Sequence, residues 1–580
     1  MDTFAAFTAS LHDNAALLLV AMPLIGAVLV RLMGRNGNEP VYYTALTNVW
    51  VCCGLVVLAV FQLEPRSEFD DLFRPQMLTS LALSEDEGAA RLMSDVAPAA
   101  TDEASPQPAE QSIAAASQRR PLPYPRLSVA INGLNLWLVA LTVAAVTAAV
   151  RGIDRQRDYL TSRLSWLLLT EAALLGTLVA QDVILLSGCH LLSVFGLFVL
   201  IGLSTSPQRH AVAHRFLRTQ LSGGVLLSLG LVGAAVSHWW MTLAAEVAAP
   251  LSFSLNQIVA QIPDLALTSE AGHAYWRSVL PWLFLLITAG CVLRIALPPL
   301  HHWWLQAMEH SDRGTAGLLA CGYLPTGLYV VARIVGPLFP ERCLELTPRL
   351  LTWTLLAAVA LALSGWKLAT AMRAGSLPPG GLKTDEPLQR RLIGLALAMC
   401  LSIGFGAMIS TEPLAVRGAL LLTVSASAAT GLAVWLLPGS PSSDLAGRRS
   451  RRLAVVVRWL LLSGLVAVPI SGTFWGLLLV AYGFSRHSAL LTLLLLLSLV
   501  VFSGAVLRGL SDSSRADSDT SPNTATAGLL GMLPLTLVLI TTAVAPTLIC
   551  GPPPPPETDA IEGGQQETTD VADPPLFNAS

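Results

Sequence analysis

Four ionisable side chains within or beside long apolar stretches are the residues of this sequence that could do chemistry. Glu171, His190 and Arg294 lie inside such stretches, and His301 follows the pair Pro298–Pro299. Ionisable groups inside a membrane are costly and usually functional, because they mark paths for ions or protons. These residue types therefore point to the transfer of protons or cations.

Glu171 and His190 could each carry a proton. Glu171 lies near the middle of its apolar stretch and is the best partner for a cation; the alternative is a protonated, hydrogen-bonded core residue. His190 belongs to a residue type whose titration range suits a proton relay, although a lone histidine in a helix also serves as a packing residue. Asp182 and Asp312 precede apolar stretches and are expected to cap helices.

Arg294 offers a different chemistry, because a guanidinium stays protonated in proteins. It could hold a fixed positive charge, order water and pair with a carboxylate, but it could not load and release a proton. The alternatives are a structural counter-ion or an arginine that extends to the inner surface. His301 could connect the chain break at Pro298–Pro299 to water on the inner side. The proton-path candidates are therefore Glu171, His190, Arg294 and His301.

The elements that must position these residues are membrane helices. The chain has 580 residues, of which 53% are hydrophobic and only 13% are charged, whereas soluble domains carry roughly twice that charged fraction. The apolar segments are continuous rather than alternating, so strands are not expected. The predicted class is an all-α polytopic membrane protein with about 14 transmembrane helices. The expected spans are residues 14–33, 43–63, 128–150, 162–180, 183–204, 219–241, 279–299, 313–335, 350–372, 391–411, 416–437, 455–480, 487–508 and 526–550.

Prolines interrupt two of these spans. Pro298 and Pro299 fall in the seventh span, and Pro469 falls in the twelfth. Because the two spans are five apart along the chain, each repeat has an odd number of helices, and the two units that carry the breaks should have opposite orientations. Paired broken helices in inverted repeats mark an ion or substrate path near the bilayer midplane. The alternative is that these prolines are ordinary, since proline is commoner in membrane helices than in soluble ones.

This reasoning gives a domain organisation with two repeats in the membrane. Residues 1–63 form helices 1 and 2, 64–127 a polar and largely disordered outer loop, and 128–161 helix 3 with an inner loop. Two inverted five-helix repeats follow at 162–335 and 350–508. The last helix covers 526–550, and a disordered, acidic, proline-rich tail covers 551–580. Lys and Arg gather in alternate loops, which predicts both termini on the outer face.

Cysteines and glycines supply no cofactor signature. The eight cysteines are scattered without CxxC or Cys/His spacing, so neither an iron–sulfur cluster nor a zinc site is expected. No nucleotide-binding loop, flavin fingerprint or nucleophile triad is apparent. Redox catalysis in this chain is therefore not expected, and neither is binding of nucleic acid.

The order of several motifs resembles a known family. The stretches "RIALPPLHHWW", "TAGLL" and "YVVARIVGPLFP" look like the broken seventh helix and eighth span of the antiporter-like membrane subunits of respiratory complex I. This family includes NADH:quinone oxidoreductase subunit M and is shared with Mrp-type antiporters and membrane-bound hydrogenases. "LLLTEAALLGTLVAQDVILLSGCHLL" and "VPISGTFWG" resemble its fourth, fifth and twelfth spans, so the chain looks like a divergent member of the subunit M type.

The departures from the family pattern fall on its charge-relay residues. The family's glutamate of the fifth helix falls at or beside His190–Leu191, and its lysine of the seventh falls on Arg294. Its lysine of the eighth helix falls near Pro325, its histidine of the eleventh around Ser425, and its glutamate of the twelfth on Leu477. Reduced or absent proton pumping is therefore a real alternative for this chain.

The resemblance implies a proton-translocating, or degenerate and supporting, membrane-arm subunit of an NADH:quinone oxidoreductase-like complex. Partner subunits would hold NADH, flavin, iron–sulfur clusters and quinone, and the chain would lie in a bacterial-type inner (plasma) membrane beside other membrane-arm subunits. Two alternatives use the same fold. One is a subunit of a cation/proton antiporter or of an ion-coupled uptake complex; the other is a structural scaffold that no longer conducts.

Overall fold

The computed structural model describes most of the chain. Described residues are 2–62, 77–82, 126–156, 159–245, 251–268, 270–374, 386–410, 412–436, 464–465, 467–469, 471–511 and 525–550. The predicted disordered tail at 551–580 and most of the predicted outer loop at 64–127 lie outside them.

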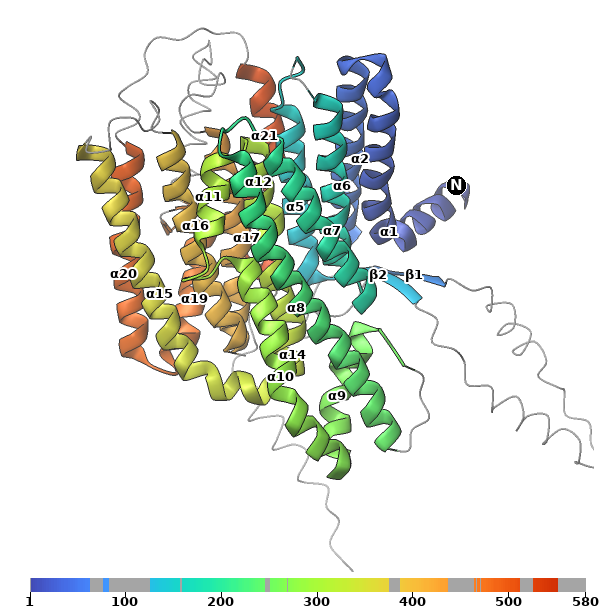
Figure 1. Cartoon of the computed structure of the whole chain (residues 1–580), viewed down its shortest axis with the longest axis vertical. Helices are drawn as coiled ribbons and strands as arrows, with labels where there is room; N and C mark the ends of the chain where they lie inside the picture. Colours follow the sequence, from blue (N-terminus) through green and yellow to red (C-terminus); the bar gives the residue numbers. More distant parts are fainter. Residues whose placement is uncertain are drawn as a thin grey trace, which may run out of the picture.

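Helices make up nearly all of the described structure (Figure 1). The long ones are α1 (Asp2–Met33), α2 (Asn38–Gln62), α5 (Gly133–Arg151), α6 (Leu160–Val179), α7 (Val183–Gly202), α8 (Arg209–Ala244), α10 (Glu270–Ile295), α15 (Pro340–Ala374), α16 (Glu386–Ile409), α17 (Pro413–Leu436), α20 (Ala489–Ser511) and α21 (Ala525–Val544). Shorter ones are α9 (Leu255–Thr268), α11 (His302–His310), α19 (Gly472–Ser485) and α22 (Thr547–Cys550). One further span is built from α12 (Arg313–Leu318), α13 (Leu324–Val330) and α14 (Gly336–Leu338), joined by the π-helical turns η3 (Leu319–Tyr323) and η4 (Val331–Val335).

The prediction of a helical polytopic membrane protein is confirmed. Among the described residues, 12 helices are long and apolar enough to cross a membrane, and Gly472–Ser485 and Met532–Val544 are shorter apolar helices. Each of the predicted spans overlaps one of these segments, the twelfth only in its second part. The number of fourteen crossings stays a prediction, because the first part of the predicted twelfth span lies outside the described residues.

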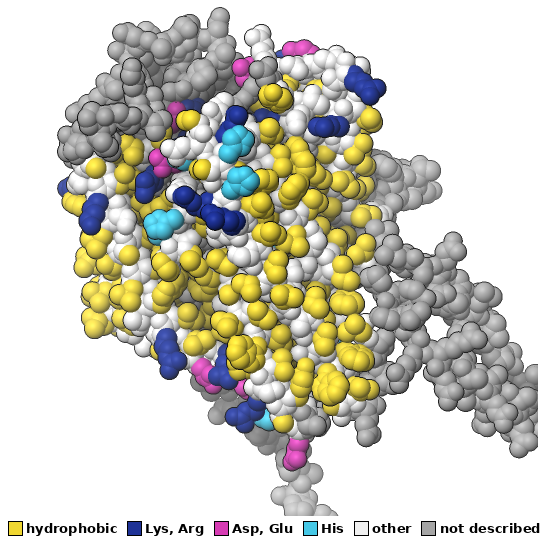
Figure 2. Space-filling model, in the orientation of Figure 1, with side chains coloured by type: hydrophobic (Ala, Val, Ile, Leu, Met, Phe, Trp, Pro, Cys, Tyr) yellow, Lys and Arg dark blue, Asp and Glu magenta, His cyan; other side chains and the backbone are white. Residues whose placement is uncertain are grey.

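The core of the bundle lies around four spans in its interior. The apolar windows of α5 and of Arg313–Leu338 are completely buried, and those of α16 and α17 are nearly so. Helices at the periphery, such as α2, α15 and α20, bury only a third of theirs. Figure 2 shows one such outer face, with hydrophobic side chains spread between two ends where charged side chains gather. This distribution suits a bundle whose sides face lipid.

The described residues at the two predicted breaks are non-helical and share one backbone feature. Helix α10 ends at Ile295, and α11 begins at His302. Around Pro469, residues 467–469 are non-helical and α19 begins at Gly472. In each case an alanine two residues before the proline has a positive φ, 61° at Ala296 and 54° at Ala467. The two interruptions therefore share an Ala-x-Pro sequence and a left-handed alanine, which supports the predicted repeat.

Glycines let each broken helix approach its neighbour closely. A Cβ atom on Gly290 of α10 would lie 2.8 Å from the carbonyl oxygen of Gly223 on α8. A Cβ atom on Gly476 of α19 would lie 2.8 Å from the carbonyl oxygen of Gly418 on α17. The sixth and seventh spans thus pack as the eleventh and twelfth do, through small residues at the interface. The inverted orientation of the two units, and the domain boundaries, stay predictions.

A short antiparallel pair of strands differs from the expectation that strands are absent. Strand β1 (Met77–Ala82) pairs with β2 (Arg126–Ile131), which precedes α5. The predicted third span began at residue 128, but the helix begins at Gly133. The reason is a capping box, in which Asn132 and Asn135 exchange side-chain and backbone hydrogen bonds and fix the start of the helix.

Candidate functional site

Arg294 lies in the last turn of α10, directly before the helix break, and is only 1% exposed. Helices α7 and α13 and the π-helical turn η3 supply its neighbours. A buried guanidinium is tolerated only if acceptors satisfy its donors. The question for this site is therefore which groups accept from Arg294.

The partner of Arg294 is a histidine rather than a carboxylate. Its Nη1 lies 2.7 Å from Nδ1 of His190 and 3.3 Å from Nε2 of the same ring. Since arginine can only donate, a ring nitrogen of His190 accepts this hydrogen bond and carries no proton. Among the described ion pairs, none joins Arg294 to an acidic residue.

Tyr323 and Thr326 hold the guanidinium from the eighth span. The Cζ atom of Arg294 lies 4.0 Å from the centre of the Tyr323 ring, a cation–π geometry. Its Nε donates to Oγ1 of Thr326 at 2.6 Å and to the carbonyl oxygen of Tyr323 at 3.3 Å. Tyr323 ends the π-helical turn η3, and such turns frequently occur at functional sites.

Gln220 of α8 joins this group to the backbone before the break. Its Oε1 accepts from the hydroxyl of Tyr323 at 2.8 Å, and its Nε2 donates to the carbonyl oxygen of Leu293 at 3.1 Å. We refer to Arg294, His190, Tyr323, Thr326 and Gln220 as the Arg294 cluster. Sequence reasoning found the first two and missed the last three, although a buried arginine requires such acceptors.

Glu171 lies apart from the Arg294 cluster. Its side chain is fully buried in α6, and neither carboxylate oxygen has a hydrogen-bond partner among the described residues. It is close enough to the thiols of Cys52 and Cys53 on α2 to interact with them electrostatically. The structure therefore does not bring Glu171 into the Arg294 cluster, and its role as a proton-path residue stays a prediction.

His301 lies on the other side of the break, at the start of α11. Its ring stacks on that of His302 with centroids 4.7 Å apart, and it is half-buried. No described hydrogen bond connects it to the Arg294 cluster. Helix α11 is fixed to the second half of the chain by Trp304, whose Nε1 donates to the carbonyl oxygen of Gly394 at 2.9 Å.

A group of ion pairs ties α6, α12 and α16 together at the charged end near the start of the eighth span. Asp312 accepts from Arg163, and Glu386 accepts from Arg313 at 2.8 Å and from Arg390 at 2.7 Å. Asp312 occupies the N-cap position of α12, but its side chain makes no capping bond. Its carboxylate binds Arg163 instead, because an ion pair with a buried guanidinium stabilises the structure more than a side-chain cap of the helix would.

Asp182 and Arg333 organise the opposite end of the eighth span. Asp182 caps α7, as expected, by accepting from the N–H groups of Ile184 and Leu185. Burial raises the pKa of this carboxyl, and the two N–H groups act in the opposite direction. Arg333, a buried charge that sequence reasoning missed, donates to Gln181 and, at 2.6 Å, to the carbonyl oxygen of Ala180.

The second half of the chain lacks charges at the positions that correspond to the family's relay. Two of these positions hold the buried residues Ser425 and Leu477. The relay position of the eighth span, in the first repeat, holds Pro325. Arg417, near the start of α17, is a buried charged residue that sequence reasoning did not single out. Among the described residues, the Arg294 cluster is therefore the more extensive polar site of the two breaks.

Known proteins that resemble this chain in sequence match only part of it. No family model matches the chain. The chain is 26% identical over 216 residues to NADH-quinone oxidoreductase subunit M of Rhodobacter capsulatus, covering 36% of this chain and 39% of that one. It is 23% identical over 249 residues to NADH-ubiquinone oxidoreductase chain 4 of Marchantia polymorpha, covering 42% of this chain and 45% of that one. The matched regions span less than half the length of these curated relatives.

Solved structures with the same fold cover nearly the whole chain. A chain of respiratory complex I from Thermus thermophilus with bound NADH superimposes with a TM-score of 0.64 at 18% identity, covering 92% of this chain and 96% of that one. The membrane-bound sulfane sulfur reductase, an archaeal respiratory membrane complex, gives a TM-score of 0.64 at 13% identity, with 93% and 96% covered. The Mrp complex from Dietzia sp. gives 0.63 at 12% identity, with 93% and 96% covered. The resemblance to antiporter-like membrane subunits is confirmed.

Proposed function

We propose that this chain is a membrane-arm subunit of an NADH:quinone oxidoreductase-like respiratory complex, in which it supports proton translocation without a lysine at the helix break. The observation that carries this proposal is the Arg294 cluster. It occupies the break of the seventh span, where the family has a titratable lysine, and it holds a charge that does not titrate.

The contacts of Arg294 favour a supporting role. Its guanidinium is fixed by Tyr323, Thr326 and His190. For His190 to take up a proton on the accepting nitrogen, it would have to give up the hydrogen bond and stand beside a second positive charge. A path through this site would therefore require His190 to separate from Arg294. The fixed charge can instead orient water and set the electrostatic potential that neighbouring translocating subunits experience.

The proposal places redox chemistry and most of the translocation in partner subunits. NADH, flavin, iron–sulfur clusters and quinone belong to those partners, and the coupling would reach this chain through contacts in the membrane. The chain lies in a bacterial-type inner membrane with both termini outside. The arginines Arg31, Arg35, Arg209, Arg215 and Arg218, exposed at the ends of α1 and α8, would then face the inside, in agreement with the positive-inside rule.

Membership of an Mrp-type cation/proton antiporter is the second candidate, because the Mrp complex superimposes as well as the respiratory chains do. The deciding experiment is purification of the full chain from native membranes in a mild detergent, followed by identification of its partners. Partners that bind flavin, iron–sulfur clusters or quinone would support the first proposal. Recovery with antiporter subunits alone would support the second, and recovery of the chain without partners would contradict both.

A further inference from the structure

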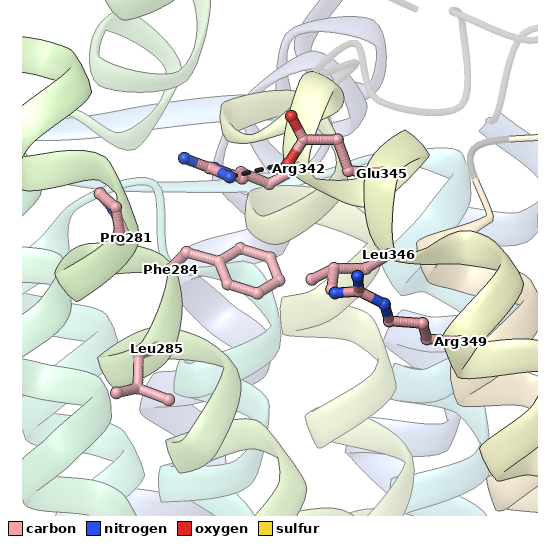
Figure 3. A pocket seen from close by; sticks show the side chains of 7 residues that line it. All are labelled: Pro281, Phe284, Leu285, Arg342, Glu345, Leu346 and Arg349. Atoms are coloured by element: carbon pink, nitrogen blue, oxygen red, sulfur yellow. Dashed lines mark hydrogen bonds and ion pairs between the residues drawn. The ribbon is translucent and has the colours of Figure 1, made fainter.

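A groove opens between α10 and the first turns of α15, at the end of the bundle opposite the ion pairs of Glu386. Its volume is about 560 Å³. Phe284 and Leu285 of α10 form one wall, and Arg342, Leu346 and Arg349 of α15 stand along the other (Figure 3). One side of the groove is therefore apolar, and the other presents two guanidinium groups.

The groove carries an excess of positive charge. Nη1 of Arg342 lies 2.7 Å from Oε2 of Glu345, so one guanidinium already has a carboxylate partner. No described hydrogen bond or ion pair engages Arg349, which is exposed. Within the described part of the chain, one positive charge thus has no protein partner beside an apolar wall. An anion with an apolar body would complement both features.

The spacing of charges along α15 places Arg349 at the level of lipid headgroups. The next charged residue along this helix is Lys367, also exposed and 18 positions further on. That separation is about 27 Å along a helix, close to the ~30 Å thickness of the hydrocarbon core. Arg349 and Lys367 therefore mark the two surfaces of the bilayer on this helix.

The exposed side chains around the groove also place it at the level of the lipid headgroups. Trp282 of α10, next to the groove, is 67% exposed, as expected for an interfacial aromatic residue. Leu356 and Leu363 follow Arg349 along α15 and are 64% and 55% exposed, so the surface that continues from the groove is apolar. Acyl chains cover such a surface in a membrane.

We propose that this groove binds one anionic phospholipid, whose phosphate accepts hydrogen bonds from Arg349 and Arg342. Its acyl chain lies along Leu346, Phe284 and Leu285. A zwitterionic lipid fits less well, because its own cation would stand against Arg349. An acidic segment of a neighbouring subunit would satisfy the arginines, but it would not cover the apolar surface that continues along Leu356 and Leu363.

The test is a binding titration of the full-length chain in detergent with short-chain phosphatidylglycerol, short-chain phosphatidylcholine and inorganic phosphate as separate probes. We expect saturable binding of phosphatidylglycerol that is at least five times tighter than binding of phosphatidylcholine, and no competition by equimolar phosphate. Arg349→Gln should weaken the binding of phosphatidylglycerol about five- to tenfold, and Arg349→Lys should restore part of it. Arg486→Gln, which changes an exposed arginine outside the groove, should leave the affinity unchanged.

Several outcomes would overturn the proposal. Equal affinities for the two lipids would show that the charge of the headgroup does not contribute to binding. Full competition by phosphate would show that the acyl chain does not contribute. An Arg349→Gln variant that binds like the unmodified chain, while its unfolding midpoint is unaltered, would place the lipid elsewhere. In the chain purified with its partners, a cross-link from residue 349 to an acidic protein segment would assign the groove to a subunit contact.

Discussion

Nη1 of Arg294 donates a hydrogen bond to Nδ1 of His190 across 2.7 Å and so joins α10 to α7 directly before the break of the seventh span. Both side chains are almost completely buried, with exposed fractions of 1%. A cation and an acceptor that can itself become a cation share this site. Its stability and its capacity to carry protons therefore depend on the same contact.

Two substitutions of His190 should distinguish the contribution of the hydrogen-bond acceptor from that of the imidazole ring. In His190→Gln the amide oxygen can still accept from Arg294, so we expect a loss of less than about 1 kcal/mol in stability. In His190→Leu the buried guanidinium loses an acceptor, and the expected cost is about 1–3 kcal/mol or more, since the donor is charged. Thermal unfolding in detergent, compared between the two variants, measures the difference. Equal melting midpoints would mean that the hydrogen bond contributes nothing to the fold.

Arg294→Lys should restore a titratable group at the break. A buried lysine can lose its proton near neutral pH, whereas arginine cannot. We expect the variant to fold with slightly lower stability, because the ammonium loses the planar contact with Tyr323, and to show proton flux in reconstituted vesicles at or above that of the unmodified chain. Arg294→Met, which removes the charge, is the matched control and should conduct no better. Loss of folding in the lysine variant would show that Arg294 is purely structural.

The sequence was sufficient for the helical membrane class and for the positions of both breaks, because apolar length and proline are local signals. It also singled out Arg294 and His190 as buried ionisable residues. It did not reveal that they contact each other, since residues on different helices meet only through the packing of α7 against α8 and α10. For the same reason it did not reveal that Glu171 interacts electrostatically with Cys52 and Cys53.

The start of α5 shows a second kind of limit. Residues 128–131 are apolar except for Ser128 and directly precede the helix, so hydropathy alone includes them in the third span. Their pairing with Met77–Ser80 depends on a strand far away in the sequence. A local signal did exist, because Asn132 and Asn135 have the spacing of a reciprocal cap, and it would have moved the boundary to the correct residue.

Glu171→Gln should preserve the fold and lower proton flux. Neither carboxylate oxygen has a described partner, so the neutral amide of nearly the same shape loses no protein contact and avoids the cost of burying a charge. We expect an unchanged or higher melting midpoint together with a proton flux in vesicles reduced about tenfold. Glu345→Gln, an exposed carboxylate outside the bundle core, serves as the control. Unchanged flux in Glu171→Gln would reject Glu171 as a proton carrier.

Glu386→Gln should weaken the contact between α12 and α16. One carboxylate oxygen of Glu386 accepts from both Arg313 and Arg390, at 2.8 and 2.7 Å, and Arg390 is 8% exposed. Loss of the charge leaves two guanidinium groups close together without a counter-ion, and we expect destabilisation by about 1–3 kcal/mol. Glu345→Gln removes an exposed pair and should change stability by less than about 1 kcal/mol. A similar melting midpoint for the two variants would contradict the structural role of Glu386.

Replacement by glycine should stabilise the protein at Ala296 and Ala467, whereas the same replacement destabilises it at a helical alanine. Both have a positive φ, which costs an L-residue about 1–2 kcal/mol and costs glycine nearly nothing. We therefore expect Ala296→Gly and Ala467→Gly each to raise the free energy of unfolding by about 1 kcal/mol. Ala144→Gly, inside α5, should lower it by a similar amount. Melting midpoints of the three variants measure the signs. Destabilisation by glycine at 296 and at 467 would mean that helices continue through both prolines.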